Sequence, residues 1–133
     1  MADSIPKSHM DLFQKKAFAY LGVRLKNGSI QVNPVWCDHD GTHVVINSAQ
    51  GRAKDKAMRA NSAVTLCISD PDNPYRYLEV RGKVVNISTE GADDHIDRLA
   101  KRYLGQDKYP NRRPGEIRVI YRIAPERVRA FPA

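Results

Sequence analysis

The sequence has few cysteines, and neither of them lies in a pattern typical of metal binding. Its 133 residues include only Cys37 and Cys67, with no Cys-x-x-Cys pair and no neighbouring set of His and Cys ligands. A disulfide framework or a zinc site is therefore not expected, and we predict two reduced, buried thiols.

Long apolar runs, repeats and targeting signals are also missing. No apolar stretch approaches the roughly 20 residues that a membrane-spanning helix needs. Residues 1–7 lack the basic-then-apolar order of a signal peptide, which predicts a cytoplasmic protein. The length fits one domain, residues 1–133, with a core of its own.

Acidic residues are scarce relative to basic ones. The chain has 22 Lys and Arg against 15 Asp and Glu, a formal net charge of +7. Such a surplus favours an anionic partner, and nucleic acid is the first candidate to test. However, the cations are scattered along the chain, and no helix-turn-helix, zinc-finger or RNA-recognition signature is present. An anionic cofactor explains the surplus as well, so nucleic acid is the less favoured partner.

Alternating apolar residues and turn signals predict a sheet of short antiparallel strands. The hairpin signal Asn27-Gly28 joins the first two strands, and a long later strand is expected to bend near Gly82. We expect strands at 18–25, 30–35, 42–46, 64–69, 77–87 and 117–123, and a last stretch at 128–131 after a turn at Pro125.

A short opening helix is expected at residues 8–13, and two further helices complete the predicted fold. One spans residues 52–60 between strands, and the second begins at a Thr89 cap and ends at Gly105. The sequence therefore predicts a mainly β fold with α additions: a small antiparallel barrel of about six to seven strands, one inter-strand helix and one outer helix.

Residues 47–61 carry the strongest functional signal, because an apolar strand leads through Gly51 into a helix that begins with Arg52 and Lys54. The first backbone N–H groups of a helix lack intrahelical partners and lie at the positive end of its dipole, so they favour a phosphate. Arg and Lys side chains would add charge suited to phosphate oxygens. The alternative is a solvated amphipathic helix. The crowding of cations at the helix N-terminus, where the dipole disfavours them, argues for an anion.

Five motifs follow one another along nearly the whole chain: Asn33–Trp36, Asp38–Gly41, Gly51–Lys54, Tyr75–Gly82 and Tyr121–Val128. Their order and spacing resemble the pyridoxamine-phosphate-oxidase-like split barrels, and within them the flavin/deazaflavin oxidoreductases. Members of that family are typically homodimers with cofactor sites at the subunit interface, and many bind FMN or the deazaflavin F420. The resemblance implies a split barrel, a homodimer, and hydride transfer between reduced F420 and a small organic acceptor.

The resemblance also implies which residues bind the cofactor. The ring of the cofactor would lie beside Asn33, Pro34, Val35 and Trp36. The edge of the ring and the polyol chain would lie beside Asn47, Ser48 and Ala49. The phosphate would bind to Arg52 and Lys54. A partner subunit would close the site with Tyr75, Arg76 and Tyr77. Two alternatives stay open: Trp36 is a core or interface anchor, and residues 75–77 are a polar loop with aromatic anchors.

Lys56 and Arg59 lie further along the same helix and would suit the longer anionic tail of F420, so F420 is favoured over FMN. The cofactor itself carries the hydride, so we assign no catalytic side chain and no metal. The acceptor would be bound by loops 70–76 and 105–115, which the sequence does not match to a particular substrate. A non-enzymatic cofactor-binding or nucleic-acid-binding protein remains the alternative from another functional class.

Overall fold

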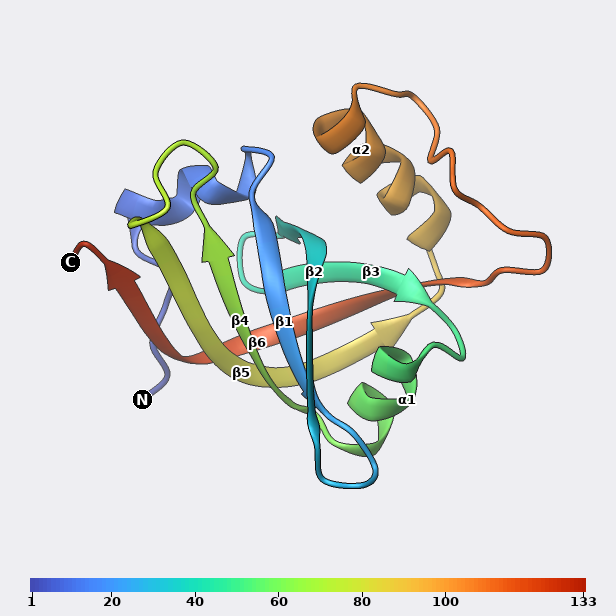
Figure 1. Cartoon of the computed structure of the whole chain (residues 1–133), viewed down its shortest axis with the longest axis horizontal. Helices are drawn as coiled ribbons and strands as arrows, with labels where there is room; N and C mark the ends of the chain where they lie inside the picture. Colours follow the sequence, from blue (N-terminus) through green and yellow to red (C-terminus); the bar gives the residue numbers. More distant parts are fainter.

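A closed barrel of six antiparallel strands forms the centre of the computed structural model, which describes residues 1–133 (Figure 1). The strands are β1 (Phe18–Arg24), β2 (Ile30–His39), β3 (Val44–Ala49), β4 (Ala63–Ser69), β5 (Tyr77–Ser88) and β6 (Arg118–Phe131). Around the barrel they follow the order β1-β2-β3-β6-β5-β4, and pairing of β4 with β1 closes it. The predicted fold class is therefore confirmed.

Three helical elements surround this barrel. A 3-10 helix, η1 (Lys7–Phe13), lies at one end, α1 (Ala53–Ala60) links β3 to β4, and α2 (Ala92–Leu104) links β5 to β6. Figure 1 shows α2 outside the barrel, followed by the long loop that leads back to β6. The inter-strand and outer helices agree with the prediction. None of the helices has the length and apolar character needed to span a bilayer.

The two-residue period of the strands fills the barrel interior. On β4, for example, Val64, Leu66 and Ile68 are buried, while their neighbours point outward. Side chains of α1 and η1 complete the same core, which includes Met58 and Leu12. A smaller cluster, formed by Val45, Ala92 and Ile120, lies where α2 packs on the outer face of β3 and β6. Both cysteines are free, with Cys37 buried and Cys67 half-buried.

The predicted start of α2 was wrong by a few residues, whereas its end was right. Gly91, at φ 74°, precedes the first helical residue Ala92, and no side chain caps the helix. Thr89 therefore lies in the turn before the helix. Gly105, at φ 71°, ends the helix in the left-handed conformation that glycine adopts without a Cβ clash.

The predicted turn at Pro125 was also wrong, because β6 runs without a break from Arg118 to Phe131. Pro125 pairs with Gly82 where the β5–β6 register shifts, and a proline is tolerated at such an irregularity because a ladder N–H is not required there. Near Gly82, where a bend was predicted, the β5–β6 register shifts, and Figure 1 shows that β5 is curved. The final stretch is thus part of one long strand rather than a separate seventh strand.

Candidate functional site

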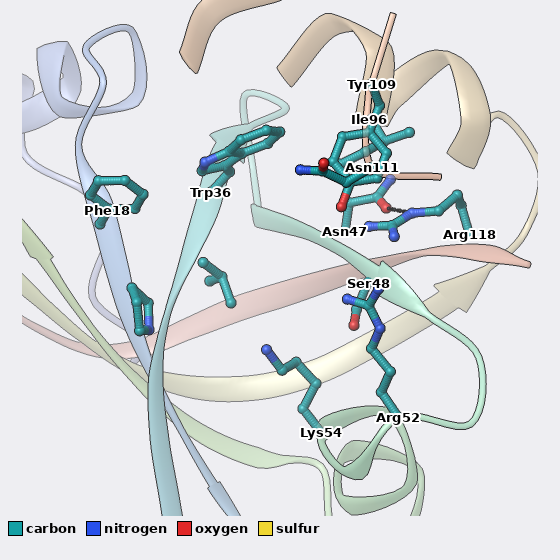
Figure 2. A pocket seen from close by; sticks show the side chains of 12 residues that line it. Phe18, Trp36, Asn47, Ser48, Arg52, Lys54, Ile96, Tyr109, Asn111 and Arg118 are labelled. Carbon is teal, nitrogen blue, oxygen red and sulfur yellow. Dashed lines mark hydrogen bonds between the residues drawn. The ribbon is translucent and has the colours of Figure 1, made fainter. Parts of the chain in front are cut away.

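A cavity of about 190 Å³ lies between β2, β3, α1, α2 and the loop that precedes β6 (Figure 2). Its lining consists of Phe18, Pro34, Val35, Trp36, Asn47, Ser48, Arg52, Lys54, Ile96, Tyr109, Asn111 and Arg118. Ligand pockets usually measure roughly 300 to 1,000 Å³. This chain alone therefore encloses less space than a complete pocket for a ligand of cofactor size.

Half of the predicted cofactor-binding residues meet in this cavity, although they come from three separate segments. They are Pro34, Val35, Trp36, Asn47, Ser48, Arg52 and Lys54. Asn33 joins them indirectly, since its side-chain oxygen accepts a 2.9 Å hydrogen bond from Lys54 Nζ. Ala49 is buried beside Ser48 and does not line the cavity. The ring-wall, ring-edge and phosphate segments of the prediction are thus close together.

The remaining predicted residues lie outside the cavity. Lys56 is exposed on α1, and Arg59 pairs with the carboxylate of Asp55 at 3.0 Å.

The segment of residues 75–77 lies elsewhere too. Arg76 is held by Asp11 at 2.7 Å and by Asp70 at 2.8 Å, while Tyr77 stacks on Phe131 with a centroid separation of 5.6 Å. Tyr75 is 79% exposed. A role for this segment in a partner's site stays a prediction. The loop of residues 105–115 contributes to the cavity lining, but the loop of residues 70–76 does not.

The first turn of α1 contains an anion that the sequence argument overlooked. Asp55 is buried in the first helical turn, where its carboxylate accepts a 2.9 Å hydrogen bond from the Gly51 amide and another from the Tyr121 hydroxyl. Burial opposes ionisation, but these hydrogen bonds and the pairing with Arg59 lower the pKa of Asp55. The Asp55 carboxylate therefore already compensates part of the positive charge at the helix N-terminus. The crowding of cations there supports a bound phosphate less strongly than the sequence indicated.

The cavity itself is nevertheless strongly cationic. Arg52, Lys54 and Arg118 line it, and no Asp or Glu does. The nearby Glu116 carboxylate pairs with Arg118 and lies 3.9 Å from Arg52. Burial, together with repulsion from Arg52 and Arg118, lowers the pKa of Lys54. An anion in the cavity would offset this repulsion, so its electrostatics favour a negatively charged ligand.

A polar atom and an aromatic wall complete the lining. Ser48 is only 2% exposed, and its buried Oγ has no hydrogen-bond partner in the chain. Buried hydroxyls are normally paired, so this one is available to a ligand. Trp36 lines the cavity and also stacks on Tyr103 of α2, with ring centroids 5.0 Å apart and an interplanar angle of 7°. Trp36 is thus both a packing anchor and a cavity wall.

Five lining residues were not predicted from the sequence: Phe18, Ile96, Tyr109, Asn111 and Arg118. Arg118 is the most informative of them. Alternation along β6 would place Arg118 on the outer face of the barrel. Because α2 packs on that face, the Arg118 side chain is only 3% exposed. An arginine at the start of the apolar run 117–123 was the available signal. Tyr109 and Asn111 come from the Pro-rich loop, whose course sequence patterns do not predict.

Comparison with known proteins agrees with this architecture. A family model described as pyridoxamine 5'-phosphate oxidase matches residues 5–131. The solved structure of a protein named F420 reductase superposes with a TM-score of 0.81 at 31% sequence identity, covering 94% of this chain and 98% of that one. Among curated proteins, none matches this sequence.

More distant structures support the fold alone. HupZ from Group A Streptococcus superposes with a TM-score of 0.69 at 16% identity, covering 98% of this chain and 96% of that chain. A conserved hypothetical protein from Mycobacterium tuberculosis gives a TM-score of 0.70 at 18% identity, covering 96% of this chain and 84% of that chain. Proteins as different in sequence as these thus have the same barrel, and the function has to be argued from the cavity.

Proposed function

The chain belongs to the pyridoxamine 5'-phosphate oxidase family of split barrels, and from this premise we propose that it is an F420-dependent oxidoreductase. In this proposal it transfers a hydride between reduced F420 and a small organic acceptor. When bound, the cofactor supplies the hydride chemistry, and the protein binds it, orients it and excludes water. No side chain is assigned a catalytic role.

The observation that carries the proposal is the composition of the cavity lining. Arg52 and Lys54 would hold a cofactor phosphate, since a charged fork and a point charge converge there without a carboxylate in the lining. Pro34 and Trp36 would flank a flat ring. The unpartnered Ser48 hydroxyl supplies a hydrogen-bonding group beside them, as a few aimed polar groups do in apolar ligand pockets.

The choice of F420 over FMN is supported by the 31% identical F420 reductase, which this chain covers almost completely. Lys56 and Arg59, which first favoured the longer anionic tail, lie outside the cavity and add less support than the sequence suggested. FMN is the alternative cofactor, because the Arg52 and Lys54 pair suits its phosphate equally well.

We further propose that the protein acts as a homodimer whose partner completes the cavity. The outward face of the β1–β2 hairpin is apolar and adjoins the cavity through Phe18 and Pro34. The exposed side chains Phe18, Tyr20, Ile30 and Val32 form this hairpin face. A second copy is the favoured occupant because the face continues into a cavity that one chain leaves too small.

The test is a side-by-side titration with F420 and FMN, followed through the emission of Trp36. This residue is the chain's single tryptophan and lines the cavity, so bound cofactor should quench it. We expect tighter binding of F420, and equal or reversed affinities would contradict the cofactor choice. A screen of acceptors with the reduced cofactor then tests the activity. Binding without oxidation by any acceptor would indicate a non-enzymatic cofactor-binding protein.

Salt separates the nucleic-acid alternative from a cofactor site. Affinity carried by several backbone phosphate contacts falls steeply as salt rises, whereas a cofactor in a partly buried cavity loses less affinity. We expect the cofactor affinity to change little between low and physiological salt. A steep salt dependence together with DNA or RNA binding would favour the alternative.

A further inference from the structure

Arg118 is the most deeply buried cation of the cavity, and two of its three guanidinium nitrogens are occupied. Nε donates a 2.9 Å hydrogen bond to Asn47 Oδ1 (Figure 2). Nη1 pairs with Glu116. The guanidinium carbon lies 5.1 Å from the ring centroid of Tyr109. Nη2 has no partner within the chain. Three contacts therefore fix the guanidinium in one orientation, and its remaining nitrogen is available to a ligand in the cavity it lines.

The side-chain amide of Asn47 determines the orientation of the Arg118 guanidinium. Hydrogen bonds to α2 fix this amide in turn. Asn47 Nδ2 donates to the Ala92 carbonyl oxygen at 3.0 Å and to His95 Nδ1 at 3.1 Å. Both partners belong to the first turn of α2. With its NH₂ group committed to α2, Asn47 turns its carbonyl oxygen toward Arg118, which has only donors.

The His95 ring is fixed in the same way. Because Nδ1 accepts from Asn47, the ring proton resides on Nε2, which donates to Asp38 Oδ2 at 3.3 Å. Asp38 also accepts a 2.9 Å bond from Arg102. Burial opposes its ionisation, yet the hydrogen bonds from His95 and Arg102 hold the pKa of Asp38 well below its usual range. A continuous chain thus runs from Asp38 through His95 and Asn47 to Arg118.

We propose that Arg118 is a ligand-binding residue whose Nη2 donates to a negatively charged or carbonyl oxygen of the bound cofactor, with Asp38 and His95 as positioning residues. This proposal rests on the proposed function, since it takes the cofactor as the ligand of the cavity. Because Arg118 lines the cavity and Nη2 has no partner in the chain, a ligand oxygen that enters the cavity can accept a charge-assisted hydrogen bond from it. The more exposed Arg52 contributes charge to the same cavity, whereas the fixed Arg118 selects the position of an oxygen.

The first experiment compares the cofactor affinity of Arg118→Gln with that of the wild type, using quenching of Trp36 emission. Loss of a charged hydrogen bond should weaken binding roughly ten- to a hundredfold. The matched control is Arg122→Gln, which removes the same charge from the same strand at a residue outside the cavity. Its affinity should stay within about twofold of the wild type. Equal affinities for Arg118→Gln and the wild type would overturn the proposal.

A second variant, Arg118→Lys, tests the proposal if Arg118→Gln does not fold. Arg118→Lys keeps the charge but lacks the planar fork, so it cannot bind Asn47, Glu116 and a ligand oxygen together. We expect an affinity between those of the wild type and Arg118→Gln, with apo melting temperatures recorded for each variant. If Arg118→Lys binds the cofactor as tightly as the wild type, the charge alone accounts for the contribution of Arg118 to affinity. That result would contradict a role for its fixed guanidinium.

The positioning residues are tested through a double-mutant cycle. His95→Phe keeps an aromatic ring but removes both hydrogen bonds, so it should lower affinity in the wild type and add little loss on top of Arg118→Gln. His95→Asn, which can retain an acceptor toward Asn47, should recover part of the affinity. If His95→Phe does not fold, Asp38→Ala is used in the same cycle. Additive losses would show a general structural effect and overturn the positioning role.

These outcomes separate this inference from the proposed function. Failure of the wild type to bind F420 or FMN would contradict the proposed function itself. Binding by the wild type with no effect of Arg118→Gln would contradict only the role of Arg118. Salt titration of each variant adds a further check, because a fixed hydrogen bond should leave the salt dependence of affinity nearly unchanged.

Discussion

Lys54 on α1 donates a 2.9 Å hydrogen bond to the side chain of Asn33 on β2. The bond joins the turn proposed to hold a phosphate to the segment proposed to flank the ring. An ammonium has three donors, so this contact leaves two of them for an anion in the cavity. Lys54 is therefore oriented into the cavity before any ligand binds, and this reduces the entropic cost of binding.

Lys54→Ala should weaken cofactor binding roughly ten- to a hundredfold, because it removes a charge-assisted hydrogen bond to the cofactor phosphate. The stability of the apo protein should change little. The variant loses the bond to Asn33, about 0.5–1.5 kcal/mol, but it also relieves repulsion from Arg52 and Arg118. Cofactor titration and the apo melting temperature measure the two effects separately.

The control for this variant is Lys56→Ala. Lys56 lies on the same helix and carries the same charge, but it is exposed and does not line the cavity. Its loss should change cofactor affinity by less than about threefold. Equal losses for the two variants would mean that general surface charge, rather than the cavity, attracts the ligand.

Sequence reasoning reached the parts of the site that local patterns encode. The turn around Arg52 and Lys54 is local, so its charges could be recognised in the chain. Arg118 could not be assigned in this way, because its burial depends on α2 covering the outer face of β6. Likewise, Asp55 and Tyr121 are 66 residues apart, and only the closed barrel brings carboxylate and hydroxyl together.

The homodimer prediction is tested on the hairpin face. Val32 is 60% exposed, and Tyr20 pairs with Pro34 on the same outward face. Val32→Lys would place a charge where the second copy is proposed to pack, so desolvation should oppose association. We expect a dimer for the wild type and mainly a monomer for the variant in analytical ultracentrifugation at micromolar concentration.

Val85→Lys provides the comparison for Val32→Lys. Val85 is also an exposed valine, but it lies on β5 at the bulge facing β6, away from the hairpin face. This variant should remain a dimer. A monomeric wild type would contradict the dimer proposal. Dissociation by both substitutions would place the interface outside the hairpin face.

Gly82→Ala should destabilise the barrel. A Cβ at this position would lie 2.2 Å from the Ala124 carbonyl oxygen, and a backbone atom cannot move aside as a flexible side chain can. Overpacking of this kind typically costs about 1–3 kcal/mol, which would lower the melting temperature by several degrees. Gly22→Ala is the comparison, because its Cβ would meet the nearest atom at 3.5 Å, an ordinary contact. Since Gly22 pairs with Val32 on the hairpin face, ultracentrifugation checks that this variant has the oligomeric state of the wild type. Equal stability of the two variants at one protein concentration would contradict the clash.

The fold was largely predictable because strands and turns repeat simple local rules. The alternation of apolar residues predicted strands β1 and β4, and the Asn27-Gly28 turn predicted the hairpin between β1 and β2. Neither prediction needed tertiary information. The course of β6 was mispredicted for a physical reason. A proline usually ends a strand, but Pro125 lies at the register shift opposite Gly82, where two long strands bend together. Only the pairing partner shows that the strand continues.

Cofactor affinity should fall at alkaline pH because of Lys54. Burial and the nearby guanidinium groups lower the pKa of this lysine, so in the apo protein it loses its proton at lower pH than an exposed lysine does. A bound phosphate favours the charged form and raises that pKa. By linkage, binding is then coupled to proton uptake between the two pKa values, and affinity falls as pH rises through the apo pKa. Lys54→Arg keeps its charge throughout this range, so its affinity should depend less on pH. Trp36 quenching from about pH 7 to 10 measures both proteins, and the same alkaline loss in each would assign the titration to a group other than Lys54.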